Sequence, residues 1–356
     1  MALARLWWLL SVAGALQLSA MAQTPRVPED PLELVSGTAQ PVQTAPERAD
    51  AINLITRARQ LTNIRAQPYD LKTTFTSTAP GAPSGVWNLE DMSPSGGVYR
   101  WTAQGPSYSV TNLFSGHMLY SSDPSGRMPL RLAQVRAAIF FHFPMIGARA
   151  SIRTAPASLN GADVTCVLVE HMARIRPAAG GRLWGETEYC VDPKSGLLMT
   201  WSPAPGVYVD YDYSTGAKFH GISIPGKFTI SEAGQMVIEA RTEGITDPKG
   251  LDPSLFDPAR LTETGVGSLM SQPWQIRSIV PNFPAGAQAV VVHGLVTPSG
   301  ELTEAEVVAS SDAALNQAAL EHAARIRNWT PADGDQPGAT PQSHEVFITV
   351  QFMPPA

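Results

Sequence analysis

The C-terminal part of the chain carries the pattern that most constrains the fold. Two apolar runs, beginning near Val290 and ending near Ala309, flank a Pro-Ser-Gly turn, which is typical of a β-hairpin. Asp312 then precedes an amphipathic segment, and its carboxylate is suited to capping a helix. An alternating apolar run closes the chain at Phe352. These signals predict a small α+β domain over residues 273–356.

The order of these landmarks resembles the C-terminal domain of the TonB energy-transducer family, over residues 273–353. The shared features are G-x-V at Gly294, L-x-x-A-A-L at Leu315, W-x-P-A at Trp329 and a last strand that ends in Phe. The resemblance implies a domain that takes part in energy transduction and transmembrane transport. It would dock an envelope or outer-membrane protein by adding a strand of the partner to its sheet, without covalent chemistry.

The last strand is the predicted partner-binding edge, because open edges accept partner strands and this strand is followed by Pro354 and Pro355. Alternation places Val346 on the core face and Thr349 on the outward face. The alternatives are that the edge pairs with a second copy, forming a homodimer, or with the neighbouring domain. The residues of the predicted edge are Val346, Phe347, Ile348, Thr349, Val350, Gln351 and Phe352.

The chain has two cysteines, Cys166 and Cys190, each in a strand-like run. A Pro- and Gly-rich loop joins the two runs, so antiparallel pairing would bring the cysteines within bridging range. An even pair in an exported chain predicts one disulfide. The alternative, a metal site, has little support because the spacing is not C-x-x-C.

Residues 48–258 predict a second, larger domain. A helix with three- and four-residue apolar spacing starts at Arg48, and short strands separated by Gly-Pro-Ser turns follow. One further helix, from Pro129 to Phe143, interrupts them. The predicted fold class is therefore α+β, with a large curved antiparallel sheet and plugging helices, followed by the small α+β domain.

This region resembles the LolA/LolB fold of periplasmic lipoprotein carriers, a curved half-barrel whose concave face is plugged by helices. The motifs that carry the resemblance are Y-D-L-K-T-T-F at Tyr69, C-V-D-P-K-S-G-L at Cys190, I-P-G-K-F at Ile224 and P-S-L-F at Pro253. The resemblance implies a lipid or acyl ligand in a concave apolar pocket. The alternative for the many aromatic residues is plain core packing.

The N-terminal segment and the linker between the two domains can also be predicted from the sequence. Arg5, a short apolar run and Ala-Met-Ala at residues 20–22 predict a cleaved signal peptide over residues 1–22 and a periplasmic location. The alternative is an uncleaved anchor in the inner membrane. Residues 23–47 are predicted to be a disordered leader, and residues 259–272 a flexible linker.

Composition and motifs exclude some function classes. The net charge of −6 and the scattered arginines argue against a nucleic-acid partner. No nucleophile elbow, H-E-x-x-H helix, P-loop or dinucleotide fingerprint occurs, so we predict no enzymatic activity, catalytic residue, cofactor or metal. His142 lies between phenylalanines and could be a ligand, but a packed histidine at a helix end is the simpler interpretation.

The sequence thus predicts a non-enzymatic periplasmic adaptor of the TonB family that docks an envelope partner through its C-terminal domain. The alternative is a periplasmic carrier of lipids or lipoproteins of the LolA/LolB type. Bound lipid in the purified protein would favour the carrier, whereas capture of membrane receptors would favour the adaptor.

Overall fold

The fold is known from a computed structural model. It describes residues 39–78, 84–95, 97–106, 108–123, 128–140, 142–143, 146–159, 161–170, 186–204, 207–232, 235–265, 274–282, 288–297, 299–310, 312–326 and 344–352. Four sequence predictions fall wholly or partly outside these ranges: the signal peptide, most of the leader, the linker from residue 266 onward, and Trp329 with the loop behind it. No helix in the described ranges has both the length and the apolar character needed to cross a membrane.

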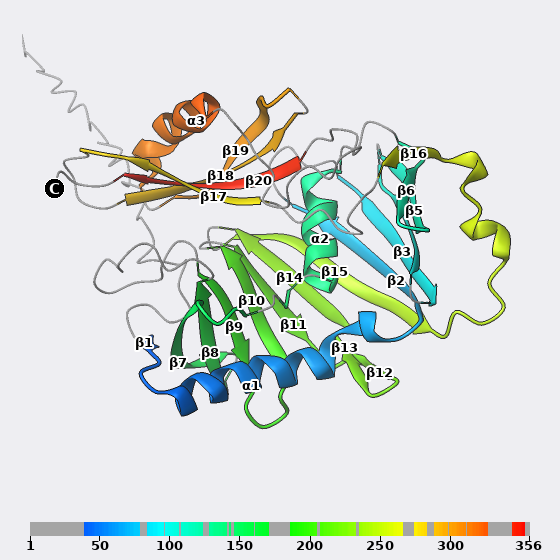
Figure 1. Cartoon of the computed structure of the whole chain (residues 1–356), viewed down its shortest axis with the longest axis horizontal. Helices are drawn as coiled ribbons and strands as arrows, with labels where there is room; N and C mark the ends of the chain where they lie inside the picture. The colour runs from blue at the N-terminus through cyan, green and yellow to red at the C-terminus, as the bar shows by residue number, and fades with distance from the viewer. Residues whose placement is uncertain are drawn as a thin grey trace, which may run out of the picture.

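One large antiparallel sheet dominates the molecule (Figure 1). Its order is β1-β7-β8-β9-β10-β11-β14-β15-β2-β3-β4-β5-β6-β16. The strands are β1 Gln40–Pro41, β2 Tyr69–Ser77, β3 Val86–Ser95, β4 Val98–Gln104, β5 Ser109–Ser115, β6 Met118–Ser121, β7 Ser151–Leu159, β8 Ala162–Glu170, β9 Thr187–Val191, β10 Leu198–Ala204, β11 Val207–Asp212, β14 Lys227–Glu232, β15 Gln235–Thr246 and β16 Thr262–Gly265. A separate hairpin consists of β12 Ala217–Phe219 and β13 Ile222–Ile224.

The two halves of the large sheet are joined by a pairing that is distant in sequence. β15 pairs with β2, with Ala240 opposite Phe75, so the end of this region returns to its beginning. Strands β2 to β6 lie on the β2 side of this junction, and β7 to β11 with β14 lie on the β15 side. Alternation along β2 buries Tyr69, Leu71 and Phe75 in the main core, as the period of two requires.

Helix α1 (Ala45–Thr62) lies along one end of the sheet in Figure 1 and buries Ala51, Ile55 and Ala58. Its first turn is a capping box, in which Thr44 accepts from the Glu47 amide while Glu47 reaches back to the cap. The helix begins three residues before the expected Arg48. The predicted disordered leader, residues 23–47, is therefore ordered at its end. Gln40–Pro41 forms β1, which pairs with β7, and α1 starts at Ala45 behind its Thr44 cap.

Helix α2 (Leu130–Phe140) packs against the large sheet and touches the C-terminal domain (Figure 1). Arg131 forms ion pairs with Glu232 of β14 and with Glu306 of β19 (Leu302–Ser310) in the C-terminal domain, the latter at 3.7 Å. Gln134 also donates to Glu232. The prediction of one helix between the strand runs is confirmed, and its polar side joins the two domains.

The C-terminal domain has a four-stranded sheet in the order β17-β20-β18-β19, covered by one helix. Asp312 accepts from the Ala314 amide at 2.9 Å and so caps the 3-10 turn Ala313–Leu315 that leads into the helix, whereas the helix itself begins after Leu315 without the predicted side-chain cap. The elements are β17 Trp274–Val280, β18 Gln288–Val296, β19 Leu302–Ser310, α3 Asn316–Arg325 and β20 His344–Phe352.

The predicted open edge at the last strand is wrong. β20 pairs in parallel with β17 through all seven β17 residues, and it pairs antiparallel with β18 on its other side. The backbone groups of Val346, Phe347, Ile348, Thr349, Val350, Gln351 and Phe352 therefore lie in the middle of the sheet. The prediction failed because the strand preceding the hairpin, Trp274–Val280, takes the place that a partner strand would need.

The expected outward face of β20 is also buried. Val346, Ile348, Val350 and Phe352 pack beneath α3, as predicted. Thr349, however, is only 5 % exposed, and its neighbour Val291 belongs to the core of the large domain. The C-terminal sheet thus buries both faces, one under α3 and the other toward the large domain.

Part of the predicted linker belongs to the large sheet. Thr262–Gly265 forms β16 and pairs with β6, with Thr264 donating to the Leu119 carbonyl. Composition predicted a flexible segment here because Thr, Gly and Ser are abundant. The open edge of β6 provides a pairing partner that composition alone does not reveal.

Candidate ligand-binding site

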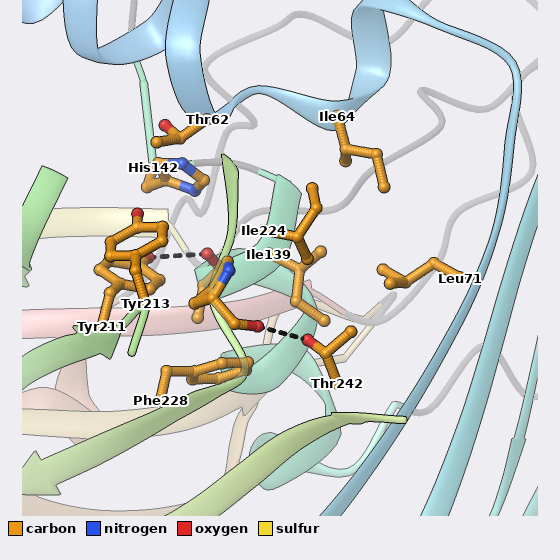
Figure 2. A pocket seen from close by; sticks show the side chains of 12 residues that line it. Thr62, Ile64, Leu71, Ile139, His142, Tyr211, Tyr213, Ile224, Phe228 and Thr242 are labelled. Atoms are coloured by element: carbon orange, nitrogen blue, oxygen red, sulfur yellow. Dashed lines mark hydrogen bonds between the residues drawn. The ribbon is translucent and has the colours of Figure 1, made fainter. Parts of the chain in front are cut away.

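A small cavity lies between the large sheet, the end of α1, the end of α2 and the β12–β13 hairpin (Figure 2). The enclosed space is about 30 Å³, and about 410 Å³ lies between its atoms when the open solvent at its mouth is included. Its walls are mostly apolar, which is the usual character of small-molecule sites. The main apolar side chains are Ile64, Leu71, Ile139, Ile224 and Phe228.

The hydroxyl groups in the wall are all engaged with the backbone. The Tyr211 hydroxyl donates to the Ala138 carbonyl at 2.7 Å, and that of Tyr213 donates to the Leu198 carbonyl at 3.0 Å. Two threonine hydroxyls behave in the same way: Thr62 donates to Ala58 at 2.8 Å and Thr242 to Pro225 at 2.7 Å. Burial raises the pKa of both tyrosines, so they remain protonated and keep these bonds.

His142 differs from the other polar residues of the wall. Its ring lies over Tyr211 in Figure 2, with the ring centroids 5.6 Å apart, and the residue is 5 % exposed. Nδ1 is buried and has no hydrogen-bond partner. Burial lowers the pKa of His142 from 6.5 to about 3, against the opposing effect of the Ala138 carbonyl, so the ring is neutral at physiological pH.

The lowered pKa predicts an acid-dependent loss of stability. Between pH 6.5 and about 3, His142 takes up a proton in the unfolded chain but not in the folded one. The stability that the buried neutral His142 gives to the fold is thus fully present above pH 6.5, and it is lost as the pH falls toward 3. Relative to His142→Phe, the wild type should lose about 2 kcal/mol of unfolding free energy between pH 7.5 and pH 5. Urea titrations across this range measure it; a constant difference between the two proteins would contradict it.

Helix α2 is fixed beside the cavity by a buried ion pair. Arg136 donates to Asp91 of β3 at 2.7 Å and to the Tyr99 hydroxyl at 2.8 Å, and the hydroxyl of Tyr99 bonds to the same carboxylate. The guanidinium lies 3.9 Å from the centre of the Trp101 ring. Burial raises the pKa of Asp91 and Arg136 opposes that rise. This geometry sets the position of the wall that carries Ile139 and His142.

The predicted disulfide is confirmed. Cys166 of β8 lies opposite Cys190 of β9 and the two are bridged. The bridge belongs to a small cluster with Ala155 and Leu168, apart from the main core. Glu188 lies near the two sulfurs, but both are used in the bridge and are not free to bind a metal.

Sequence reasoning considered His142 and several of the aromatic residues of this region without placing them together. It missed the Arg136–Asp91 pair, whose members are 45 residues apart. A hint was available, since two arginines and a glutamine interrupt the apolar pattern of residues 130–140. The partner of Arg136 could not be read from a local pattern.

No protein-family model matches the chain, and no curated protein matches it significantly. Among solved structures, the chain is similar to a LolA-superfamily protein from Nitrosomonas europaea. Identity is 12 %, the TM-score is 0.39, and the match covers 58 % of this chain and 97 % of that one.

A second similar structure is a putative outer-membrane lipoprotein-sorting protein domain from Vibrio parahaemolyticus. Identity is 9 %, the TM-score is 0.36, and the match covers 59 % of this chain and 95 % of that one. At these TM-scores neither match assigns a function to this chain. The TonB resemblance of the C-terminal domain stays a prediction.

Proposed function

We propose that this protein is a non-enzymatic periplasmic carrier of a lipid or of the acyl part of a lipoprotein. The observation that carries the proposal is the apolar cavity between the large sheet and α2, whose wall hydroxyls are already satisfied. Such a lining favours an apolar occupant, because it offers neither a charged anchor nor an unengaged hydroxyl hydrogen. The signal-like segment at residues 1–22 supports the location.

The cavity should bind an uncharged apolar fluorophore such as N-phenyl-1-naphthylamine. Replacing Ile139 with Trp would fill the cavity, because this side chain lines it from α2. We expect Ile139→Trp to weaken binding at least about tenfold, or by about 1.4 kcal/mol, from the volume lost to the ligand. Fluorescence titration measures the affinity, and mass spectrometry of an organic extract of the purified protein identifies any natural occupant.

The matched control is Leu255→Trp, since Leu255 is an exposed residue of Pro253–Phe256 and does not line the cavity. It should bind the fluorophore as the wild type does. The proposal is wrong if the wild type binds no fluorophore, or if a folded Ile139→Trp protein binds it with unchanged affinity.

A second candidate function is the adaptor role, in which the C-terminal domain docks an envelope protein by strand addition. One observation favours it: within the described residues, β17 has a sheet neighbour only on its β20 side. β19, at the other edge, has two register irregularities and a positive φ at Glu304, features that discourage strand pairing. Capture of a defined outer-membrane protein by the full chain, lost when Ile279 of β17 becomes Lys, would support this role.

A further inference from the structure

We propose that the C-terminal domain is an autoinhibitory cover for the carrier site. Docked as in this structure, it keeps α2 close to the large sheet, and the cavity beside α2 is then too small for an acyl chain. The inference rests on the carrier function proposed above and goes further, because it identifies the part of the chain that controls access to the site.

The size of the cavity means that one of its walls must move before it can hold a lipid. The enclosed space is about 30 Å³, which is room for about one or two water molecules and far less than an acyl chain occupies. The strands of the large sheet are fixed by hydrogen bonds to their neighbours. Helix α2 takes no part in this pairing, so it can shift without breaking the sheet.

Helix α2 is buried on every side. Residues 132–138 are all buried, and together they span about two helical turns. The large sheet meets the side that carries Arg136, which donates to Asp91 of β3. Gln134 lies about 200° around the helix from Arg136, yet it is only 5 % exposed. A helix packed on a sheet alone would expose that side, so a second layer covers it.

The C-terminal domain supplies apolar side chains to the core of the large domain. Val291 of β18 and Val308 of β19 are buried, and both belong to the core cluster that includes Leu132 and Val135 of α2. Neither valine belongs to the core of the C-terminal domain itself, which lies under α3. These two side chains therefore hold the C-terminal domain on the large domain and contribute little to its internal packing.

Arg131, in the first turn of α2, supplies a polar contact at the same interface. It pairs with Glu232 of β14 and, at 3.7 Å, with Glu306 of β19. When the C-terminal domain undocks, α2 loses the pair with Glu306 and its outer apolar cover. The inner pair between Arg136 and Asp91 stays, so α2 tilts about this pair and the cavity widens.

The test is Val308→Lys in the full chain, which places a buried ammonium in the contact between the domains and so favours undocking. Two quantities are measured: hydrogen exchange of the α2 amides by mass spectrometry, and the affinity for N-phenyl-1-naphthylamine. We expect α2 to exchange about tenfold faster and the fluorophore to bind about tenfold more tightly, because a closed fraction lowers the apparent affinity. Slow exchange of β20, in the interior of the C-terminal sheet, shows that this domain stays folded.

A second variant avoids any change in the core and decides the test if Val308→Lys does not fold. Glu306→Arg places two positive charges opposite each other at the Arg131 contact. It should change both quantities in the same direction, by about threefold, because the pair is partly exposed. Ala305→Lys is the matched control, since Ala305 is exposed on the same strand. It should leave both quantities unchanged.

Binding in the cavity is separated from binding to the uncovered interface by adding Ile139→Trp to Val308→Lys. Ile139 lines the cavity, so this double variant should lose the gain in affinity. A gain that persists would mean that the fluorophore binds the surface exposed by undocking, and the inhibitory role would be wrong.

The outcomes also separate the two proposals. If the wild type binds the fluorophore but α2 exchange or affinity is unchanged in the folded variants, the carrier function stands and the inhibitory role is wrong. If α2 exchanges faster but none of the proteins binds the fluorophore, the carrier function fails and the inhibitory role fails with it.

Discussion

Replacing Arg136 with methionine is expected to lower the free energy of unfolding by about 3–5 kcal/mol, because it leaves the carboxylate of Asp91 buried without its counter-charge. Asp91 is fully buried and Arg136 is 3 % exposed, so water cannot take the place of the guanidinium. The change also removes the contact of the guanidinium with Trp101. Urea denaturation of the wild type and the variant measures the loss.

Two further variants separate the ion pair from the packing. The double variant Asp91→Leu with Arg136→Met removes both charges and should recover most of the lost stability, since an apolar replacement avoids the desolvation of two ions. Lys72→Met breaks the pair with Glu90 at 3.2 Å on the exposed side of the sheet and should have no measurable effect. A single Arg136→Met variant as stable as the wild type would show that the pair does not hold α2 in place.

Breaking the bridge between Cys166 and Cys190 is expected to lower the free energy of unfolding by about 3 kcal/mol, because the separation of 24 residues sets the entropy that the unfolded chain regains. The variant Cys166→Ala with Cys190→Ala should show the loss as a lower urea midpoint. Alanine is the suitable replacement, because both sulfurs are buried and a serine hydroxyl would need a partner.

The wild type in reductant is the control for the cysteine variant, with thiol labelling to show that both cysteines are free. Its midpoint should fall to that of the double alanine variant. Equal midpoints with and without reductant, in protein shown to carry two free thiols, would contradict the prediction.

The two proposals on ligand binding depend on the same part of the fold. Arg136 positions α2, which brings Ile139 to the cavity, and His142 lies two residues beyond the end of this helix. An Arg136 variant that still folds should therefore bind the fluorophore less well than the wild type. In this way the buried ion pair links the stability of the large domain to the shape of its cavity.

Much of the local structure could be predicted from the residues themselves. The alternation of Tyr69, Leu71 and Phe75 predicts a strand buried on one face, and the structure has it. Asp312 predicts a helix start, and it caps the 3-10 turn that leads into α3. The parity of the cysteines predicts their bridge. Each of these features depends on the spacing or the identity of a few residues, and both can be taken directly from the sequence.

Strand order and long-range contacts were decided by the tertiary structure. The alternating residues of β20 are the same in an edge strand and an interior strand, so only the parallel pairing of Trp274–Val280 showed that the edge is closed. Thr349 looks solvent-facing by its polarity, yet the packing of the two domains buries it.

The candidate site follows the same division. Composition shows that aromatic and apolar residues are abundant in the large domain, but not which of them surround a cavity. That depended on the Arg136–Asp91 pair and on the return of β15 to β2, both of which join residues far apart in the chain. Local periodicity predicts which face of a helix or strand is apolar. It does not predict which other element covers that face, because the hydrophobic effect is non-directional and any apolar surface of the chain could do so.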